Sequence, residues 1–307
     1  MMPNLSRRRF IAIAASACAA TQVSAASRSV ATWRGHALGA RADLAIAGLS
    51  QAEATPLFHA VEAELSRMED LFSLYRSDSA LSRLNRHQVL PDPPPELLQL
   101  LTLAASVHRL SGGAFDPTVQ PLFALHAEAQ ARGQCASPDA IHEVRRRIGF
   151  QRVSLGTNVV RLRGNGAGLT LNGIAQGFAT DRIAALLSRE GLHDVLVNAG
   201  EIRAVGDFKG QGWPVSAPGG RTIRLADRSI ATSSASGTLV DTRAGVGHIF
   251  DPRGEEGTPR IAPVTVLHES AAIADAVSTA AVVMSDGDLS ALRSLGAEIW
   301  SNARRLA

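Results

Sequence analysis

The stretch from Leu169 to Arg182, LTLNGIAQGFATDR, changes from a strand-like pattern to a helical one. Leu169 and Leu171 alternate with polar residues, which predicts a short strand. Gly173 and Gly177 then bracket a turn, and the apolar spacing that follows predicts a helix carrying Ile174, Phe178, Ile183 and Leu187. A glycine turn at a helix N-terminus presents unpaired N–H groups, so it suits an anionic ligand such as a phosphate, although many such turns serve packing alone.

The composition indicates a folded globular protein without an affinity for nucleic acid. The chain has 307 residues, 45% of them hydrophobic, which is enough to bury a large core in one or two domains. Its formal charge of +3 comes from Arg7, Arg8 and Arg9, because the first twenty-five residues contain no acid. Without them the net charge is zero, so the rest of the chain has no basic excess for nucleic acid.

The first residues predict an export signal. Residues 6–26 read SRRRFIAIAASACAATQVSAA, in which a charged segment precedes a mild apolar segment and small residues at 23–25. The paired arginines indicate the twin-arginine route to the periplasm for a signal peptide over residues 1–25. A basic amphipathic tail is the alternative. Lipid anchoring at Cys18 is not favoured, because Ala15 stands where a lipobox has a larger aliphatic residue; removal of Cys18 would leave Cys135 without an intramolecular disulfide partner.

Helices and short strands alternate in no regular βαβ order, which indicates an α+β fold. Helix starts are predicted at Ser50, which forms a capping box with Glu53, and at Ser79 and Ser137; another helix ends at the glycines at 112 and 113. A strand is expected within 30–48 and a hairpin within 153–162. Further short strands are expected at 195–198, 202–205, 213–215, 264–267 and near 230, and the chain is expected to finish in helices.

Three oxygen-bearing side chains share one face of a predicted helix at residues 274–280, ADAVSTA. Asp275, Ser278 and Thr279 stand at i, i+3 and i+4. One carboxylate, hydroxyl groups and a nearby backbone carbonyl suit Mg²⁺ or Ca²⁺ and would hold zinc poorly. The alternative is a solvated helix face without a ligand.

Residues 247–252, GHIFDP, place a histidine three residues before an Asp-Pro turn. His248 and Asp251 therefore suggest a general base with an orienting carboxylate. In the alternative interpretation, Asp251 caps a turn and His248 is merely exposed. A serine hydrolase is not supported, because TSSASG at 232–237 lacks the G-x-S-x-G elbow.

Taken in order, seven segments resemble the motif series of the ApbE family, the FAD:protein FMN transferases, from about Trp33 to about Ser285. The segments are SLYRSDSALSRLN, SGGAFDPTVQPL, LNGIAQGFATDR, LVNAGEIRAVG, SIATS, HIFDPR and VTVLHESAAIADAVSTA. The resemblance implies a bilobed α+β transferase with mainly antiparallel sheets, formed as a single domain by residues 28–307. It also implies an enzyme that binds FAD and Mg²⁺, joins FMN by a phosphoester to a Thr or Ser hydroxyl of a target protein, and releases AMP.

Matched to the family motifs by position, Asp275 and Thr279 correspond to metal ligands, and Gly173 to the residue whose carbonyl binds the metal. His248 matches the proposed catalytic base, and Asp251 lies in the same motif. For the flavin, Leu38 stands at the methionine of the M-G-T motif, and Gln176 stands where a Lys or Glu contacts FAD. The flavin-pocket segments are matched by Tyr75, Ala114, Phe115, Asp116 and Thr232.

The sequence departs from the family pattern at four places. Thr170 replaces an acid, Gln176 removes a charge, Glu201 interrupts a Gly-Gly pair, and Ser234 replaces a glycine. None of these departures replaces Asp275, Thr279 or His248. LNGIAQG with a twin-arginine signal also resembles the branch that serves nitrous oxide reductase maturation, which implies a membrane redox-complex subunit as acceptor.

Two other functions stay open from the sequence. One is a FAD-binding accessory or maturation factor for a periplasmic or membrane redox complex, without transferase turnover. The other is a metal-binding structural protein without flavin. The acceptor protein is left open because its motif lies on another chain.

Overall fold

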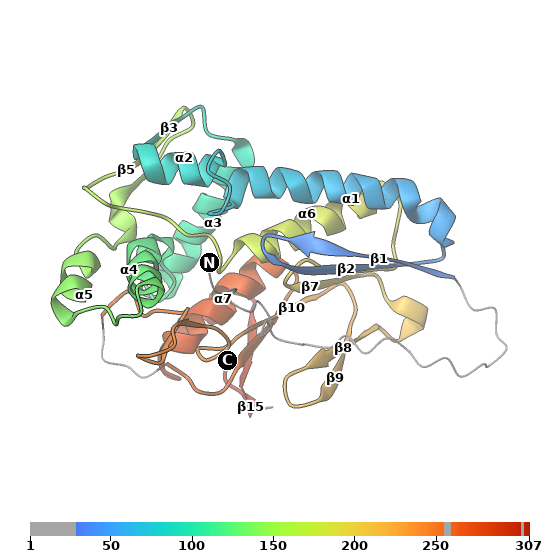
Figure 1. Cartoon of the computed structure of the whole chain (residues 1–307). Coiled ribbons are helices and arrows are strands. Elements are labelled where there is room, and N and C mark those ends of the chain that lie inside the picture. The colour runs from blue at the N-terminus through green and yellow to red at the C-terminus, as the bar shows by residue number, and fades with distance from the viewer. Residues whose placement is uncertain (1–28, 255–258, 302–303) are drawn as a thin grey trace.

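The computed structural model describes residues 29–254, 259–301 and 304–307, and its centre is an antiparallel sheet (Figure 1). Eight strands follow the spatial order β1-β2-β6-β7-β10-β13-β14-β15, and every neighbouring pair is antiparallel. The strands are β1 (Val30–Ala37), β2 (Ala40–Ala47), β6 (Val195–Asn198), β7 (Ile202–Val205), β10 (Ser229–Ser233), β13 (Val264–His268), β14 (Glu298–Ser301) and β15 (Arg304–Arg305).

Alternating side chains direct the two faces of this sheet to two different cores. Leu44 and Ile46 of β2 pack with helices α1 (Gln51–Phe72) and α6 (Ala175–Arg189). Ala45 and Ala47 face the hairpin of β8 (Trp213–Ala217) and β9 (Arg221–Leu225). Helix α7 (Ala271–Val283) lies beside α6 and covers β10 and β13, as Figure 1 shows near the middle of the molecule.

A second group of elements forms the other lobe. Short strands β3 (Val89–Pro91), β4 (Val153–Leu155) and β5 (Val159–Leu162) make a small sheet, and β11 (Leu239–Asp241) pairs with β12 (Val246–Gly247). The helices of this lobe are α2 (Ala80–His87), α3 (Pro95–Leu110), α4 (Gln120–Ala131) and α5 (Pro138–Arg145). Short 3₁₀ turns occupy Pro117–Val119, Phe150–Arg152, Phe208–Gly210 and Asp288–Leu295. The α+β, bilobed prediction is confirmed.

The predicted helix starts are confirmed by their caps. Ser50 and Glu53 form the reciprocal capping box of α1, and Ser79 and Ser137 accept N–H groups at the starts of α2 and α5. These signals are local, so the sequence alone contains them. Residues 1–28, with the predicted signal peptide and Cys18, lie outside the described residues. Within the described ranges, no helix has both the length and the apolar character needed to cross a membrane.

The strand predicted at Leu169–Asn172 is wrong. The segment is extended and its leucines are buried, but Asn85 replaces a strand partner. The Asn85 side chain accepts from Leu169 N over 2.7 Å and donates to Leu169 O over 2.8 Å, while Thr170 N donates to Pro117 O. The alternation therefore reflects burial between a helix and a loop, where no neighbouring strand is in reach.

Two other predictions need correction. Residues 30–48 form the two strands β1 and β2, joined by Leu38 and Gly39, which both have positive φ. A leucine is an unusual residue for such a turn, so the usual Asn-Gly signal was absent. The chain also ends in β14 and β15 rather than in helices, because Val264–Leu267 needs a partner beyond β10.

Helices α6 and α7 touch at Gly177. A Cβ atom at this position would collide with the carbonyl oxygen of Ala271 and lie 2.7 Å from the Cα of Ala272. Glycine at 177 therefore sets how closely the two helices approach.

We expect Gly177→Ala to lower the free energy of unfolding by about 1–3 kcal/mol, because the added methyl group meets backbone that cannot move aside alone. Urea denaturation measures this loss. Ser188→Ala, at an exposed position on the same helix, should change stability by less than about 0.5 kcal/mol. Equal effects of the two substitutions would contradict the close contact.

Candidate functional site

The central glycine turn and helix α7 meet at Gly173 and Thr279. A Cβ atom on Gly173 would lie 3.0 Å from Thr279 Oγ1 and 3.4 Å from the ring of Phe115. Three segments far apart in the sequence thus converge here, from the AFD motif, the central turn and α7. Ser233 of β10 adds a fourth, since its hydroxyl lies 3.4 Å from Thr279 Oγ1.

Asp275 lies one turn before Thr279 and is almost fully buried, with 4% of its surface exposed. One of its carboxylate oxygens accepts the Gly177 N–H over 3.1 Å. Burial raises the pKa of Asp275 to about 7. Ser278 does not project toward a ligand, because its hydroxyl donates to Asp275 O and contacts Ser233 Oγ over 2.8 Å.

A second carboxylate, Glu201, belongs to the same site and was not among the predicted site residues. It precedes β7, and burial together with the negative charge of Asp275 raises its pKa well above the usual value. A backbone hydrogen bond from Thr232 opposes this shift. In the sequence, the one indication of this role was an acid between two short apolar strands. There, Glu201 was interpreted only as a residue that interrupts a glycine pair.

These residues fit a hard divalent cation. Asp275 is buried and Glu201 is half-buried beside it, so their negative charges disfavour each other; no arginine or lysine of the described part of the chain forms an ion pair with either. A cation would offset this charge, held by Asp275, the Thr279 hydroxyl and the Gly173 carbonyl. Among the described residues, there is no cluster of three or more His, Cys, Asp or Glu side chains suited to a metal.

The segment Ala114–Asp116 lies directly under the central turn. Ala114 and Phe115 are in the core, and Phe115 contacts the Gly173 position. The Asp116 carboxylate is already satisfied, since it accepts from Thr118 N, Thr118 Oγ1 and Phe150 N. Phe115 and the backbone are therefore the parts of this motif nearest the cation-site residues.

Gln176 and Thr232 both lie against the segment Gly200–Glu201. The Gln176 side chain packs against Gly200, where φ is +111° and a Cβ atom would overlap it. Thr232 contacts Glu201 through its backbone and Thr265 through its hydroxyl over 3.0 Å.

In the described part of the chain, neither Leu38 nor Tyr75 forms a hydrogen bond with Asp275 or Thr279. Leu38 holds φ at +46° at the tip of the β1–β2 hairpin and packs on the edge of the large core. Tyr75 follows α1 with 86% of its surface exposed. An exposed aromatic ring and a strained hairpin tip are features found where a protein meets a ligand.

His248 has the tautomer that a general base requires. Its Nδ1 lies 3.1 Å from the carbonyl oxygen of Thr238, and a carbonyl accepts only, so Nδ1 carries the proton. Nε2 is then left with a free electron pair. His248 is exposed, as the alternative interpretation of its motif expects, and desolvation by the protein around it still lowers the pKa of its imidazole, which favours the neutral form.

Asp251 does not contact His248 in the described hydrogen bonds. Its carboxylate forms a bidentate pair with Arg253, with Nε and Nη2 at 2.9 and 2.7 Å. Arg253 in turn donates to Val283 O at the end of α7. The orienting partner of His248 is thus the Thr238 carbonyl, and Asp251 connects its motif to α7.

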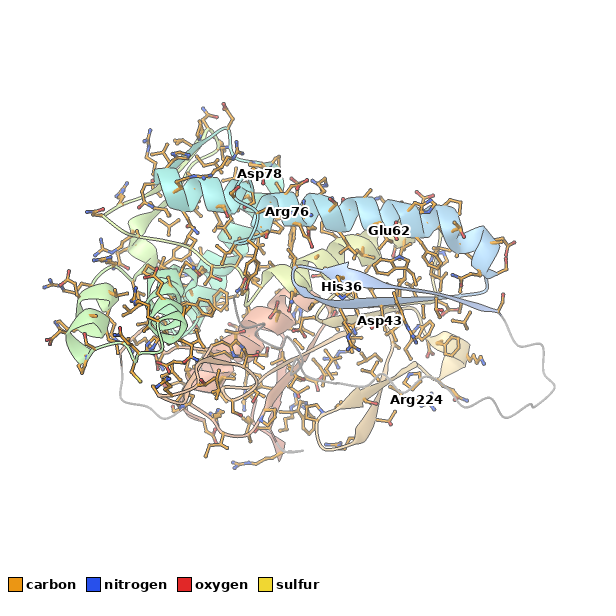
Figure 2. All side chains as sticks on the ribbon, in the orientation of Figure 1. His36, Asp43, Glu62, Arg76, Asp78 and Arg224 are labelled. Carbon is orange, nitrogen blue, oxygen red and sulfur yellow. The ribbon has the colours of Figure 1, made fainter. Side chains whose placement is uncertain are left out.

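A hollow of about 280 Å³ lies elsewhere, between β1 and α1. His36 and Glu62 lie on its two sides (Figure 2). None of the predicted site residues lines this hollow. The candidate site is therefore defined by the contacts of Gly173, Asp275 and Thr279 and not by the hollow.

We expect Asp275 to make stability depend on pH in the absence of divalent cations. Its pKa is about 7 in the folded protein and 3.8 in the unfolded chain, so its stabilising contribution is full below about pH 4 and is lost as pH rises through 7. Between pH 5 and 8, unfolding free energy in EDTA should fall more steeply for the wild type than for Asp275→Asn. Parallel slopes in urea denaturation would refute the raised pKa.

The comparisons with known proteins agree on one family. The sequence profile of the ApbE family matches residues 38–298. The chain is 26% identical over 290 residues to the FAD:protein FMN transferase of Klebsiella pneumoniae (strain 342), covering 88% of this chain and 83% of that protein. It is 31% identical over 244 residues to the FAD:protein FMN transferase of Vibrio cholerae, covering 74% and 72%.

Solved structures give the same result. The apo form of the Pseudomonas stutzeri flavinyl transferase ApbE superposes with a TM-score of 0.78 at 26% identity, covering 91% of this chain and 94% of that one. The ApbE protein of Thermotoga maritima gives 0.76 at 26% identity, covering 89% and 94%. With the profile matched over most of its length, this chain belongs to the ApbE family.

Proposed function

We propose that this chain is an enzyme that transfers FMN from FAD to a Thr or Ser hydroxyl of a target protein and releases AMP, with Mg²⁺ as the cation. The observation that carries the proposal is the contact of Gly173 with Thr279, one helical turn after Asp275, whose buried carboxyl group has no ion-pair partner among the described residues. The relatives named FAD:protein FMN transferase support the reaction class.

The residues divide the chemistry between them. The cation would supply charge neutralisation at the pyrophosphate. His248 Nε2 takes the proton from the acceptor hydroxyl as its oxygen bonds to the phosphorus of the FMN half; the bond from that phosphorus to the AMP half breaks, and AMP leaves. Tyr75 supplies an exposed face for the flavin ring. Leu38 and Ala114–Asp116 are assigned to the flavin by motif similarity.

A single assay tests this function. Protein, FAD, Mg²⁺ and a candidate acceptor are incubated, and AMP and acceptor mass are followed. Asp275→Ala should remove turnover, because it deletes the strong anionic ligand, while Thr279→Ala should be milder, because water replaces a neutral hydroxyl. Full Mg²⁺-dependent AMP release by Asp275→Ala would refute the metal assignment. FAD bound without AMP release by the wild type would favour the accessory-factor function.

We expect His248→Ala to slow single-turnover FMN transfer by about 10²- to 10⁴-fold and to leave FAD affinity nearly unchanged. Because the pKa of His248 is lowered, the wild-type rate at saturating Mg²⁺ should rise with pH below the ordinary histidine value of 6.5 and level off above it. This rise should be absent in the variant. A variant rate within a few-fold of the wild type would remove His248 from the mechanism.

The partner and the location follow as part of the same proposal. The acceptor is a membrane redox-complex subunit, such as one serving nitrous oxide reduction, and the enzyme meets it in the periplasm. Support comes from the sequence, where Arg7 and Arg8 precede an alanine-rich segment. Mature protein at normal yield in the periplasm of cells without a twin-arginine transporter would contradict this route.

A further inference from the structure

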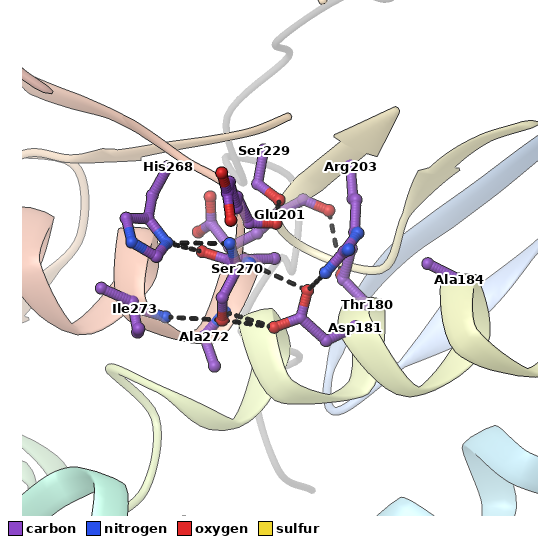
Figure 3. A network of polar contacts seen from close by, with 12 residues as sticks. Thr180, Asp181, Ala184, Glu201, Arg203, Ser229, His268, Ser270, Ala272 and Ile273 are labelled. Atoms are coloured by element: carbon purple, nitrogen blue, oxygen red, sulfur yellow. Dashed lines mark hydrogen bonds and ion pairs between the residues drawn. The ribbon is translucent and has the colours of Figure 1, made fainter. Parts of the chain in front are cut away.

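Three hydrogen bonds at the start of α7 end on one carboxylate of α6, that of Asp181. Ser270 Oγ donates to Asp181 Oδ2 over 2.6 Å (Figure 3). The N–H groups of Ala271 and Ala272 donate to its two oxygens over 2.9 and 3.1 Å. The first N–H groups of a helix have no partner within the helix, and a negative charge there is favoured by the helix dipole.

Asp181 is also held from the sheet. Arg203 of β7 forms an ion pair with the same carboxylate, and only 18% of the Asp181 side chain is exposed. Figure 3 shows Arg203 and the α7 start approaching Asp181 from different directions. One carboxylate therefore connects α6, α7 and the sheet.

The spacing connects this carboxylate to the cation site. On α6, Gly177 and Asp181 are one turn apart, and on α7, Ala271 and Asp275 are one turn apart. In one turn, the Ala271 N–H of α7 donates to the Asp181 carboxylate of α6. In the next turn, the Gly177 N–H of α6 donates to the Asp275 carboxylate of α7 over 3.1 Å. Two hydrogen bonds of opposite direction, one turn apart, fix the register of the helices.

We propose that Asp181 is a positioning residue that sets where the Asp275 carboxylate lies for the cation. This inference rests on the proposed function, in which Asp275 is a metal ligand. Asp181→Asn would place an amide N–H₂ against N–H donors and lose the pair with Arg203, so the start of α7 would shift on α6.

The helix itself has other support at its start, so the substitution should not unfold it. Ser270 Oγ still accepts Ile273 N–H over 3.3 Å, and Ser270 N donates to His268 Nδ1 over 2.8 Å. His268 is fixed in turn by its Nε2, which donates to Leu295 O over 2.8 Å.

Binding of Mn²⁺ to the full-length protein without flavin, measured by electron paramagnetic resonance, tests the inference. We expect Asp181→Asn to weaken Mn²⁺ affinity by at least about tenfold, the scale seen when a partner of a ligand is removed. The Mn²⁺ affinity of Ser270→Ala should lie between those of Asp181→Asn and the wild type, because the hydrogen bonds from Ala271 N and Ala272 N to Asp181 remain. In turnover, Asp181→Asn should raise the half-saturating Mg²⁺ concentration more than it lowers kcat.

The matched control is the next residue of α6. Arg182 forms an ion pair with Glu64 of α1 at 3.0 Å and, among the described residues, no hydrogen bond or ion pair with α7, so Arg182→Met should bind Mn²⁺ within about twofold of the wild type. Near-wild-type affinity in both Asp181→Asn and Ser270→Ala, or an equal loss in Arg182→Met, would overturn the inference. A wild type that binds no Mn²⁺ would instead refute the metal site itself.

Discussion

The contact between α6 and α7 is the constraint on which the candidate site depends. Gly177 lets the backbones meet, and among the described residues its N–H alone donates a hydrogen bond to the Asp275 carboxylate. A carboxylate this deeply buried costs free energy unless a cation or a proton compensates it. The burial of the Asp275 carboxylate is therefore unfavourable by itself. The packing of α7 against α6 and against β10 and β13 holds this carboxylate in position.

Helix α7 is matched by charge at both ends. Asp181 accepts N–H groups at its start, whereas Arg253 and Arg260 donate to the carbonyl groups of Val283, Ala281 and Met284 at its end. Both arrangements agree with the helix dipole. Asp251 therefore has a structural role, because its carboxylate binds the Arg253 guanidinium, which donates to the end of α7.

The parts of the fold that the sequence predicted are those with local causes. The serine caps, the glycine stops and the face shared by Asp275 and Thr279 each depend on residues within one or two turns. The Leu169 segment was misassigned because its partner, the Asn85 side chain, is 84 residues away. Glu201 was missed for the same kind of reason. Its neighbour Asp275 is distant in the sequence, and the two carboxyl groups become neighbours only in the folded protein.

The residues assigned to the flavin site could be predicted from the sequence only in part. Phe115 is brought against Gly173, which motif order alone does not imply. Leu38 and His248 are placed by turns and short strands whose sequences carry weak signals, a leucine at positive φ and a two-residue strand. Motif similarity is the basis on which these residues are assigned to the flavin site, and the contacts give His248 the Thr238 carbonyl as its orienting group.

The exposure of Tyr75 has a practical consequence. It is the single tyrosine of the chain, and 86% of its surface faces solvent. Biosynthetic incorporation of 3-fluorotyrosine would therefore give one fluorine resonance, free of overlap, on the ring that the proposed function assigns to the flavin. Its chemical shift would follow occupancy of that surface directly, in the resting protein as well as during turnover.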